Sequence, residues 1–197
     1  MIRKGAMFGL DARIALAIFG ALSVISGAAL YSAIKESKIT AAVSQINEIS
    51  KALIAFNLDT GSDLPQYNST VRDASELVKS TADGSKGPYL PYKDSGNGFT
   101  FELMFLGSNS FVHIYDCADG FGDQASSVHC ETCVSGKNCA PWMKLGDMST
   151  DKLTSIDEKI DGGDGFSSGK VRVQWADAGK TDARLFVRLT ERNLSQL

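Results

Sequence analysis

The four cysteines of the chain lie close together in the sequence, at Cys117, Cys130, Cys133 and Cys139. Cysteine sulfur forms disulfides, binds zinc or exchanges electrons, depending on its surroundings. The Cys130-x-x-Cys133 pair has the spacing of a zinc-binding knuckle, but a zinc ribbon usually has two such pairs and this window has one. Cys139 and His129 are the residues that could complete a zinc site. An even number of cysteines in an exported chain favours two disulfides, for which three pairings are open.

Three aspartates, Asp157, Asp161 and Asp164, lie in a second stretch with ligand chemistry, the sequence Asp-Glu-Lys-Ile-Asp-Gly-Gly-Asp. Calcium binds six to eight oxygen atoms, and carboxylates on a glycine-rich turn supply them. The spacing does not fit an EF-hand, which needs acidic residues at alternate positions before its glycine. We therefore expect a solvated helix end without a metal, and calcium bound by the three aspartates is the alternative.

The sequence offers no convincing catalytic constellation. Residues Gly165–Gly169 match the Gly-x-Ser-x-Gly pattern of hydrolase nucleophile elbows, but an elbow follows a strand and begins a helix. Here the segment is expected between a helix and a strand, and both histidines, His113 and His129, precede the serine, contrary to the usual order. The sequence also lacks a glycine-rich phosphate-binding loop with its lysine. We expect a protein that is not an enzyme and needs no cofactor.

Composition limits the classes of protein to which the chain can belong. Its 197 residues fit one domain with an appendage, and the 43% apolar and 22% charged fractions are those of a globular protein. The net charge of −3 argues against a nucleic-acid-binding protein, because such proteins need a clustered positive surface. The mean hydropathy of −0.07 excludes a protein that crosses a membrane many times.

One stretch of the chain, Ile14–Ile34, is 21 residues long and carries no charge. About 20 such residues span a bilayer as a helix. The residues before this stretch include three basic side chains, Arg3, Lys4 and Arg13, and one acidic side chain, Asp11. This excess of positive charge favours a cytoplasmic location for the N-terminal side. Everything after the stretch would then be exported, and export favours oxidised cysteines.

The apolar pattern continues beyond this stretch and becomes amphipathic. Apolar residues recur at steps of three and four, at Val43, Ile46, Ile49, Leu53 and Phe56. No proline interrupts residues 7–60, and Gly61 followed by Pro65 is a typical helix end. The sequence thus predicts one long helix, with a transmembrane part at 7–35 and an amphipathic part that reaches about residue 60.

The globular part, 36–197, is predicted to belong to the α+β class, with the amphipathic half of the helix packed against an antiparallel sheet of about four strands. Alternating patterns predict strands at 99–106, 110–116, 170–175 and 183–189. The first two would be joined by a hairpin loop at 107–109. Short helices are expected at 150–160 and after Ser69 or Thr70, either of which could cap the helix that carries Leu77. The 117–142 segment is expected to be a long loop held by the disulfides.

The N-terminal residues resemble those of the type IV pilin superfamily, which includes the pseudopilins of type II secretion. That family has a short basic leader, then a hydrophobic first residue of the mature chain, and a carboxylate at its fifth position. Cutting the leader Met1–Ala6 from Met7 places Asp11 fifth. This chain departs from the pattern in three ways, because Ala6 replaces the usual glycine, aspartate replaces the usual glutamate, and Arg13 adds a charge.

The resemblance implies sites and partners near the N-terminus. A prepilin peptidase would cut between Ala6 and Met7 and N-methylate Met7. The carboxylate of Asp11 would pair with the freed α-amine of a neighbouring subunit. The partners would be homologous pilin or pseudopilin subunits in a helical filament and an assembly platform in the inner membrane. The chain would cross the bacterial inner membrane once, with its C-terminal domain in the periplasm, before it joins a pilus or pseudopilus.

Two other interpretations of the apolar stretch remain open. It could be a plain membrane anchor, or a secretory signal cleaved near Ser26–Ala29. In both cases the globular part would be a disulfide-stabilised periplasmic binding domain, either held at the membrane or released from it.

Overall fold

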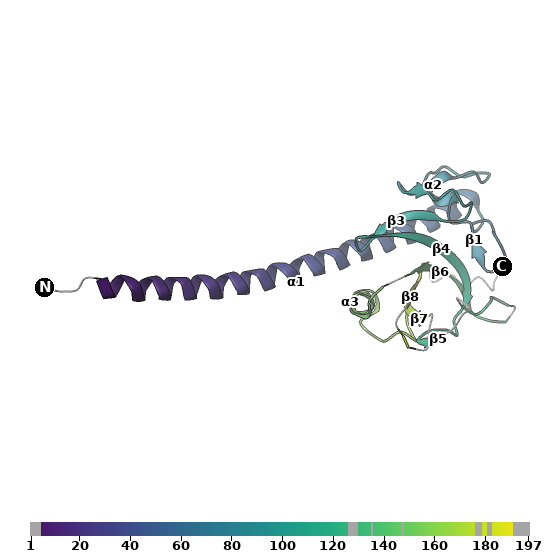
Figure 1. Ribbon diagram of the computed structural model, residues 1–197. Helices are drawn as coiled ribbons and strands as arrows, with labels where there is room; N and C mark the ends of the chain where they lie inside the picture. The colour runs from purple at the N-terminus through teal and green to yellow at the C-terminus, as the bar shows by residue number, and fades with distance from the viewer. Residues whose placement is uncertain are drawn as a thin grey trace. The chain divides into compact units, whose positions relative to one another are not determined.

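A computed structural model describes residues 5–125, 130–134, 136–146, 148–175, 179–180 and 183–190 (Figure 1). The chain divides into two compact units, one that ends at Thr40 and one that begins at Ala41. We call the second unit the head and describe each unit by itself.

The first element, α1, is a single helix over Gly5–Thr60 (Figure 1). It confirms the long helix predicted from the absence of proline. In the first unit, every side chain from Gly9 to Lys38 is exposed. We call residues 9–38 the exposed segment.

The part of α1 that belongs to the head buries one stripe of apolar side chains. Ile46, Ile49, Leu53 and Phe56 are all buried, and Ile49 and Phe56 are fully enclosed. This spacing of three and four residues is the stripe that the sequence predicts. The helix ends where Gly61, with φ +69°, adopts the left-handed conformation and donates its N–H to the carbonyl of Asn57 at 2.9 Å.

The head contains one sheet, which has eight strands in the part of the chain that the structure describes. The strands are β1 Val71–Arg72, β2 Lys93–Asp94, β3 Phe101–Phe105, β4 Ser108–Ala118, β5 Gln124–Ala125, β6 Cys139–Leu145, β7 Val171–Trp175 and β8 Ala183–Arg188. Seven run in the order β2-β3-β4-β6-β8-β7-β5, and β1 pairs with β4. All pairings are antiparallel except β5 with β7.

The α+β class is therefore confirmed, with more strands than expected. The four predicted strands correspond to β3, β4, β7 and β8. The head part of α1 packs on this sheet, where Gln45 donates to the carbonyl of Met104 at 3.2 Å and Ser50 donates to the carbonyl of Leu189. A further helix, α3 over Thr150–Asp161, packs against β7.

The most consequential difference from prediction is β6, which lies between β4 and β8 in the sheet. The prediction of one long loop over 117–142 is therefore wrong, because the last residues of this segment form the start of β6. Both faces of β6 are covered, so its sequence does not alternate between apolar and polar residues. Pro141 within it is also atypical of a strand inside a sheet.

The helix predicted after Ser69 or Thr70 begins later than expected. The Oδ1 atom of Asn68 accepts hydrogen bonds from the N–H groups of Thr70 and Val71, at 3.0 and 2.9 Å. This side-chain turn directs the chain into β1 instead of a helix. The helix that carries Leu77 is α2, Glu76–Lys79.

The hairpin between β3 and β4 is also tighter than predicted. Phe105 pairs with Ser108, so the loop contains only Leu106 and Gly107 instead of the three residues expected at 107–109. Both loop residues have positive φ, +52° and +84°, as two-residue hairpin loops favour.

Candidate functional site

The exposed segment of α1 carries the first group of predicted functional residues. Its large apolar side chains are between 45% and 73% exposed, and they are Leu10, Ile14, Leu16, Ile18, Phe19, Leu22, Val24, Ile25, Leu30, Tyr31 and Ile34. The helix is long and apolar enough to cross a membrane, with a mean hydropathy of 2.1 over its most apolar window. Asp11 lies on α1, three residues before the uncharged run.

The backbone of the predicted cleavage site also belongs to helix α1. Ala6 and Met7 follow the first residue of the helix, Gly5. Residues 1–4 of the predicted leader lie outside the described residues. Cleavage at Ala6, methylation of Met7 and an assembly role for Asp11 stay predictions from the sequence.

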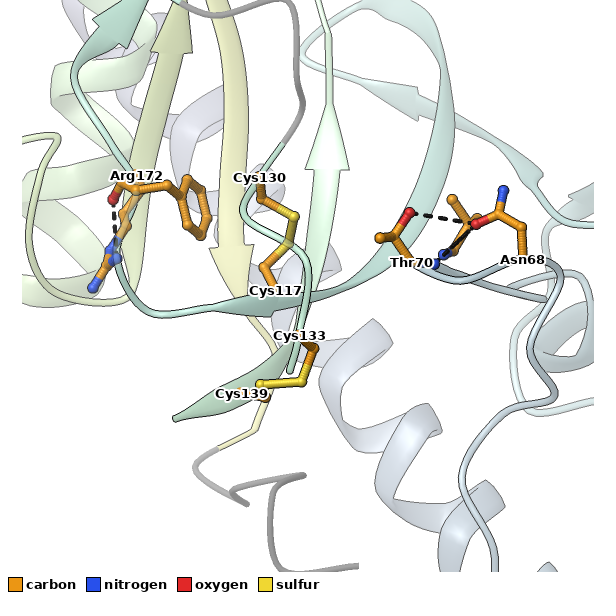
Figure 2. Close-up of a disulfide and its surroundings, with 9 residues drawn as sticks. Asn68, Thr70, Cys117, Cys130, Cys133, Cys139 and Arg172 are labelled. Atoms are coloured by element: carbon orange, nitrogen blue, oxygen red, sulfur yellow. Dashed lines mark hydrogen bonds between the residues drawn. A yellow bond between two sulfur atoms is a disulfide. The ribbon is translucent and has the colours of Figure 1, made fainter. Parts of the chain in front are cut away.

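All four cysteines form disulfides, which confirms the prediction and selects one of its three pairings (Figure 2). Cys117 pairs with Cys130, and Cys133 pairs with Cys139, with a Cα–Cα distance of 5.7 Å in both cases. A zinc site needs free thiolates, so the zinc alternative is wrong for this oxidised state. His129 of that alternative lies outside the described residues.

The two disulfides attach the segment between β4 and β6 to the sheet. Cys117 lies on β4 and Cys139 is the first residue of β6. Cys117 and Cys130 belong to a cluster of buried residues. Its other buried members are Val71, Tyr115, Phe121, Ala140, Trp142 and Phe186. The Cys117–Cys130 bond is therefore part of the head's apolar core.

Arg172 on β7 is a buried charged residue that the sequence analysis did not single out. It is only 8% exposed. Its Nη1 atom donates to the carbonyls of Asp119 and Phe121, at 2.9 and 3.0 Å. The guanidinium also lies over the rings of Phe121 and Trp142, 5.3 and 5.0 Å from their centroids.

This environment points to a structural role for Arg172. Burial lowers the pKa of its guanidinium, although arginine still stays charged at neutral pH. The charge holds the 119–121 backbone against the sheet. The sequence of the strand gives no signal of this burial, because it depends on the carbonyls of Asp119 and Phe121, which are distant in the sequence.

The three aspartates of the predicted calcium alternative come together at the end of α3. One oxygen from each of Asp157, Asp161 and Asp164 lies within 4.8 Å of the others. Asp157 and Asp161 are four residues apart on one face of α3, and Asp164 follows the helix end at Gly162, whose φ is +80°. Asp157 is only 3% exposed, so a solvated helix end is wrong for this residue.

The crowding of carboxylates changes the acidity of Asp157. Burial raises its pKa to about 6, and the adjacent carboxyl group of Asp161 contributes in the same direction. The N–H of Gly165, which donates to Asp157 Oδ2 at 3.2 Å, opposes this rise.

The residues considered for catalysis do not form a hydrolase site in the described structure. The Gly165–Gly169 segment follows α3 and precedes β7, the reverse of a nucleophile elbow, as the sequence predicts. The hydroxyl of Ser168 donates to the carbonyl of Asp164 at 3.0 Å. His113 lies on β4, where its ring is 5.7 Å from that of Phe99.

Comparison of this chain with protein-family models, with curated proteins and with solved structures finds no match in any of the three.

Proposed function

We propose that this chain is the precursor of a filament subunit of the type IV pilin kind, for a pilus or a type II secretion pseudopilus. The observation that carries the proposal is the contrast within α1. Its exposed segment presents large apolar side chains on every side, whereas its head part is built into the core of a globular domain. An apolar surface of this extent needs lipid or other apolar helices around it.

The charges beside the exposed segment support an exported head. Arg3, Lys4 and Arg13 outnumber Asp11 on the N-terminal side, which favours a cytoplasmic N-terminus. The two disulfides of the head fit an oxidising compartment such as the periplasm. In this proposal the precursor crosses the inner membrane once.

Processing creates the group with which Asp11 would interact. Hydrolysis of the Ala6–Met7 peptide bond leaves a carboxylate on Ala6 and a free α-amine on Met7, which is protonated at neutral pH. A charged aspartate costs about 2.5–3.5 kcal/mol at the centre of a bilayer on insertion scales. A charge-assisted hydrogen bond to the α-amine of a neighbouring subunit would offset this cost and fix the axial register of the two helices.

Assembly would then replace lipid contacts with contacts between helices. An assembly platform, driven by a cytoplasmic ATPase, would extract the processed subunits from the membrane. The exposed segments would pack together in the filament core, and the heads would face outward. The subunit itself performs no bond chemistry in this proposal.

The role of Asp11 is tested by substitution in the host that assembles the filament. Asp11→Ala should still be cleaved before Met7 but should fail to enter filaments, because the α-amine loses its counter-ion. Asp11→Glu, which introduces the residue usual in the family, should assemble. Asp83→Ala, which removes an exposed acid from a loop of the head, is the matched control and should behave like the wild type.

Filament content is measured by shearing filaments from cells and quantifying the subunit against the membrane fraction. Normal assembly of Asp11→Ala would remove the carboxylate from the mechanism. The absence of any filament in the wild type would overturn the whole proposal.

A further inference from the structure

We propose that a small cavity between the end of α1 and the sheet binds one water molecule, which joins Asn57 to Asp116. The cavity lies in the head and has a volume of about 10 Å³. Its lining includes the polar residues Asn57, Arg72 and Asp116 and the apolar residues Leu53, Leu64 and Ile114. The inference concerns the packing of the head and does not depend on the proposed function.

Two buried oxygen atoms, on residues that line this cavity, call for a hydrogen-bond donor. Among the described residues, neither Asn57 Oδ1 nor Asp116 Oδ1 has a hydrogen-bond partner. The second polar atom of each side chain is already used, because Asn57 Nδ2 donates to Asp63 Oδ1 at 3.2 Å and Asp116 Oδ2 accepts from Arg72 Nε at 2.6 Å. The bond to a carboxylate also assigns the nitrogen of the Asn57 amide, so the atom left without a donor is its oxygen.

A water molecule fits what these two atoms lack. A buried oxygen without a partner is costly, because it has lost its hydrogen bonds to solvent and gained none. Asp116 is only 4% exposed, so bulk solvent does not reach its carboxylate freely. A cavity of about 10–15 Å³ holds one water, and a buried water makes about two to four hydrogen bonds. One water can therefore donate one O–H group to Asn57 Oδ1 and the other to Asp116 Oδ1.

Arg72 offers a partner for the oxygen atom of the same water. A guanidinium carries five N–H groups. The Nε atom of Arg72 donates to Asp116, and its Nη1 atom donates to the carbonyl of Leu64 at 2.8 Å. The side chain lines the cavity, so a further N–H group can donate to the water. With this bond the water makes three hydrogen bonds, which is typical of a buried water.

A proton on Asp116 is the competing way to supply a donor, since its O–H group could donate directly to Asn57. Burial raises the pKa of the Asp116 carboxyl, whereas the charge of Arg72 lowers it and the charge of Asp63 raises it. The bond of 2.6 Å from Arg72 is charge-assisted and favours the ionised carboxylate. We therefore assign the donor to water and keep Asp116 charged.

The bound water would join three elements of the head. Asn57 lies in the last turn of α1, Arg72 belongs to β1, and Asp116 belongs to β4. The apolar stripe of α1 holds the helix on the sheet without direction, because apolar contacts are not directional. Hydrogen bonds through one water are directional, so they would fix the end of α1 against β1 and β4.

The experiment uses the full-length chain in detergent micelles, with isotope-labelled methyl groups. Nuclear Overhauser effects between water and the methyl groups of Leu53, Leu64 and Ile114 are measured at neutral pH. Methyl protons do not exchange with water, so a cross-peak reports a water molecule held close to the methyl group. We expect cross-peaks for these three residues, with the sign of a tightly held molecule. Leu103 is also buried but does not line the cavity, and it should give none.

Two substitutions on α1 assign the water to its proposed partners. Asn57→Leu removes one of the two acceptor oxygens and should abolish the cross-peaks. Asn47→Leu makes the same chemical change at an exposed position of the same helix and should keep them. The methyl spectrum of each variant shows whether its head is folded. The chemical shift of the Asp116 side-chain carboxyl carbon, measured in the wild type, should be that of an ionised carboxylate.

Several results would overturn the water site. They are the absence of cross-peaks in the wild type, equal cross-peaks for Leu103, a protonated Asp116 at neutral pH, and the loss of cross-peaks in Asn47→Leu. Persistence of the cross-peaks in folded Asn57→Leu would also overturn it, because the signal would then come from another exchanging group. None of these results bears on the cleavage before Met7, so the water site and the proposed function fail separately.

Discussion

The two parts of helix α1 differ in what surrounds their apolar side chains. The exposed segment is apolar on all sides, whereas the head part is apolar along one stripe that includes Ile49 and Phe56. Both parts are continuous helix without proline. The comparison shows that helix formation and helix environment are specified separately. The absence of breakers permits the helix, and the distribution of apolar residues selects lipid, other helices or a sheet as the neighbour.

Two phenylalanines provide the sharpest test of this difference. Phe56 is fully buried, and Phe19 is 71% exposed. Phe56→Ala should lower the free energy of unfolding of the head by about 3–5 kcal/mol, because it leaves a cavity in the core. Phe19→Ala should leave that free energy unchanged. The measurement is urea unfolding in detergent followed by tryptophan fluorescence, since Trp142 and Trp175 both lie in the head. Equal losses in the two variants would contradict the comparison.

Removing the disulfides should destabilise the head without affecting the exposed segment of α1. Replacing Cys117 and Cys130 with serine should cost about 3 kcal/mol, because the bond closes a loop with a sequence separation of 13. Replacing Cys133 and Cys139, which are separated by 6, should cost about 2 kcal/mol. Urea unfolding measures both values. Neither pair of substitutions should alter the membrane association of the exposed segment, and a loss of membrane association would show that the two parts of the chain are coupled.

A smaller effect is expected from pH. The pKa of Asp157 is raised to about 6, so the folded head binds its proton more tightly than the unfolded chain does. In EDTA, the free energy of unfolding should therefore rise by about 1 kcal/mol as the pH falls from 7 to 5. Asp157→Asn should lose this rise, and Glu158→Gln should keep it. A flat pH profile in the wild type would show that the folded head does not raise the pKa of the Asp157 carboxyl.

The sequence predicts those parts of the fold whose residues alternate between two environments. The stripe on α1, the alternation in β3 and the apolar spacing in α3 all follow from one buried face and one open face, whereas every residue of β7 is buried although its sequence alternates. Strand β6 lacks this signal because it is covered on both faces, and Pro141 argues against a strand. Its central position depends on neighbours that are distant in the sequence.

The candidate sites were also predictable from the sequence only in part. The spacing of Asp157, Asp161 and Asp164 indicates a cluster, and the structure brings them together. Their burial was not predictable, because it depends on the return of the chain at Gly169 and on the N–H groups of Lys170 and Val171. The disulfide pairing was also open, since four cysteines allow three pairings and only the fold selects one.

The central claim is that the exposed segment is an assembly helix with a new N-terminus. The most direct test is mass spectrometry of the N-terminal peptide of the protein purified from the membranes of its host. We predict that the peptide begins at Met7, so that Asp11 is its fifth residue. A chain that still begins at Met1, or one cut near Leu30 and thus deprived of most of the exposed segment, would contradict the account.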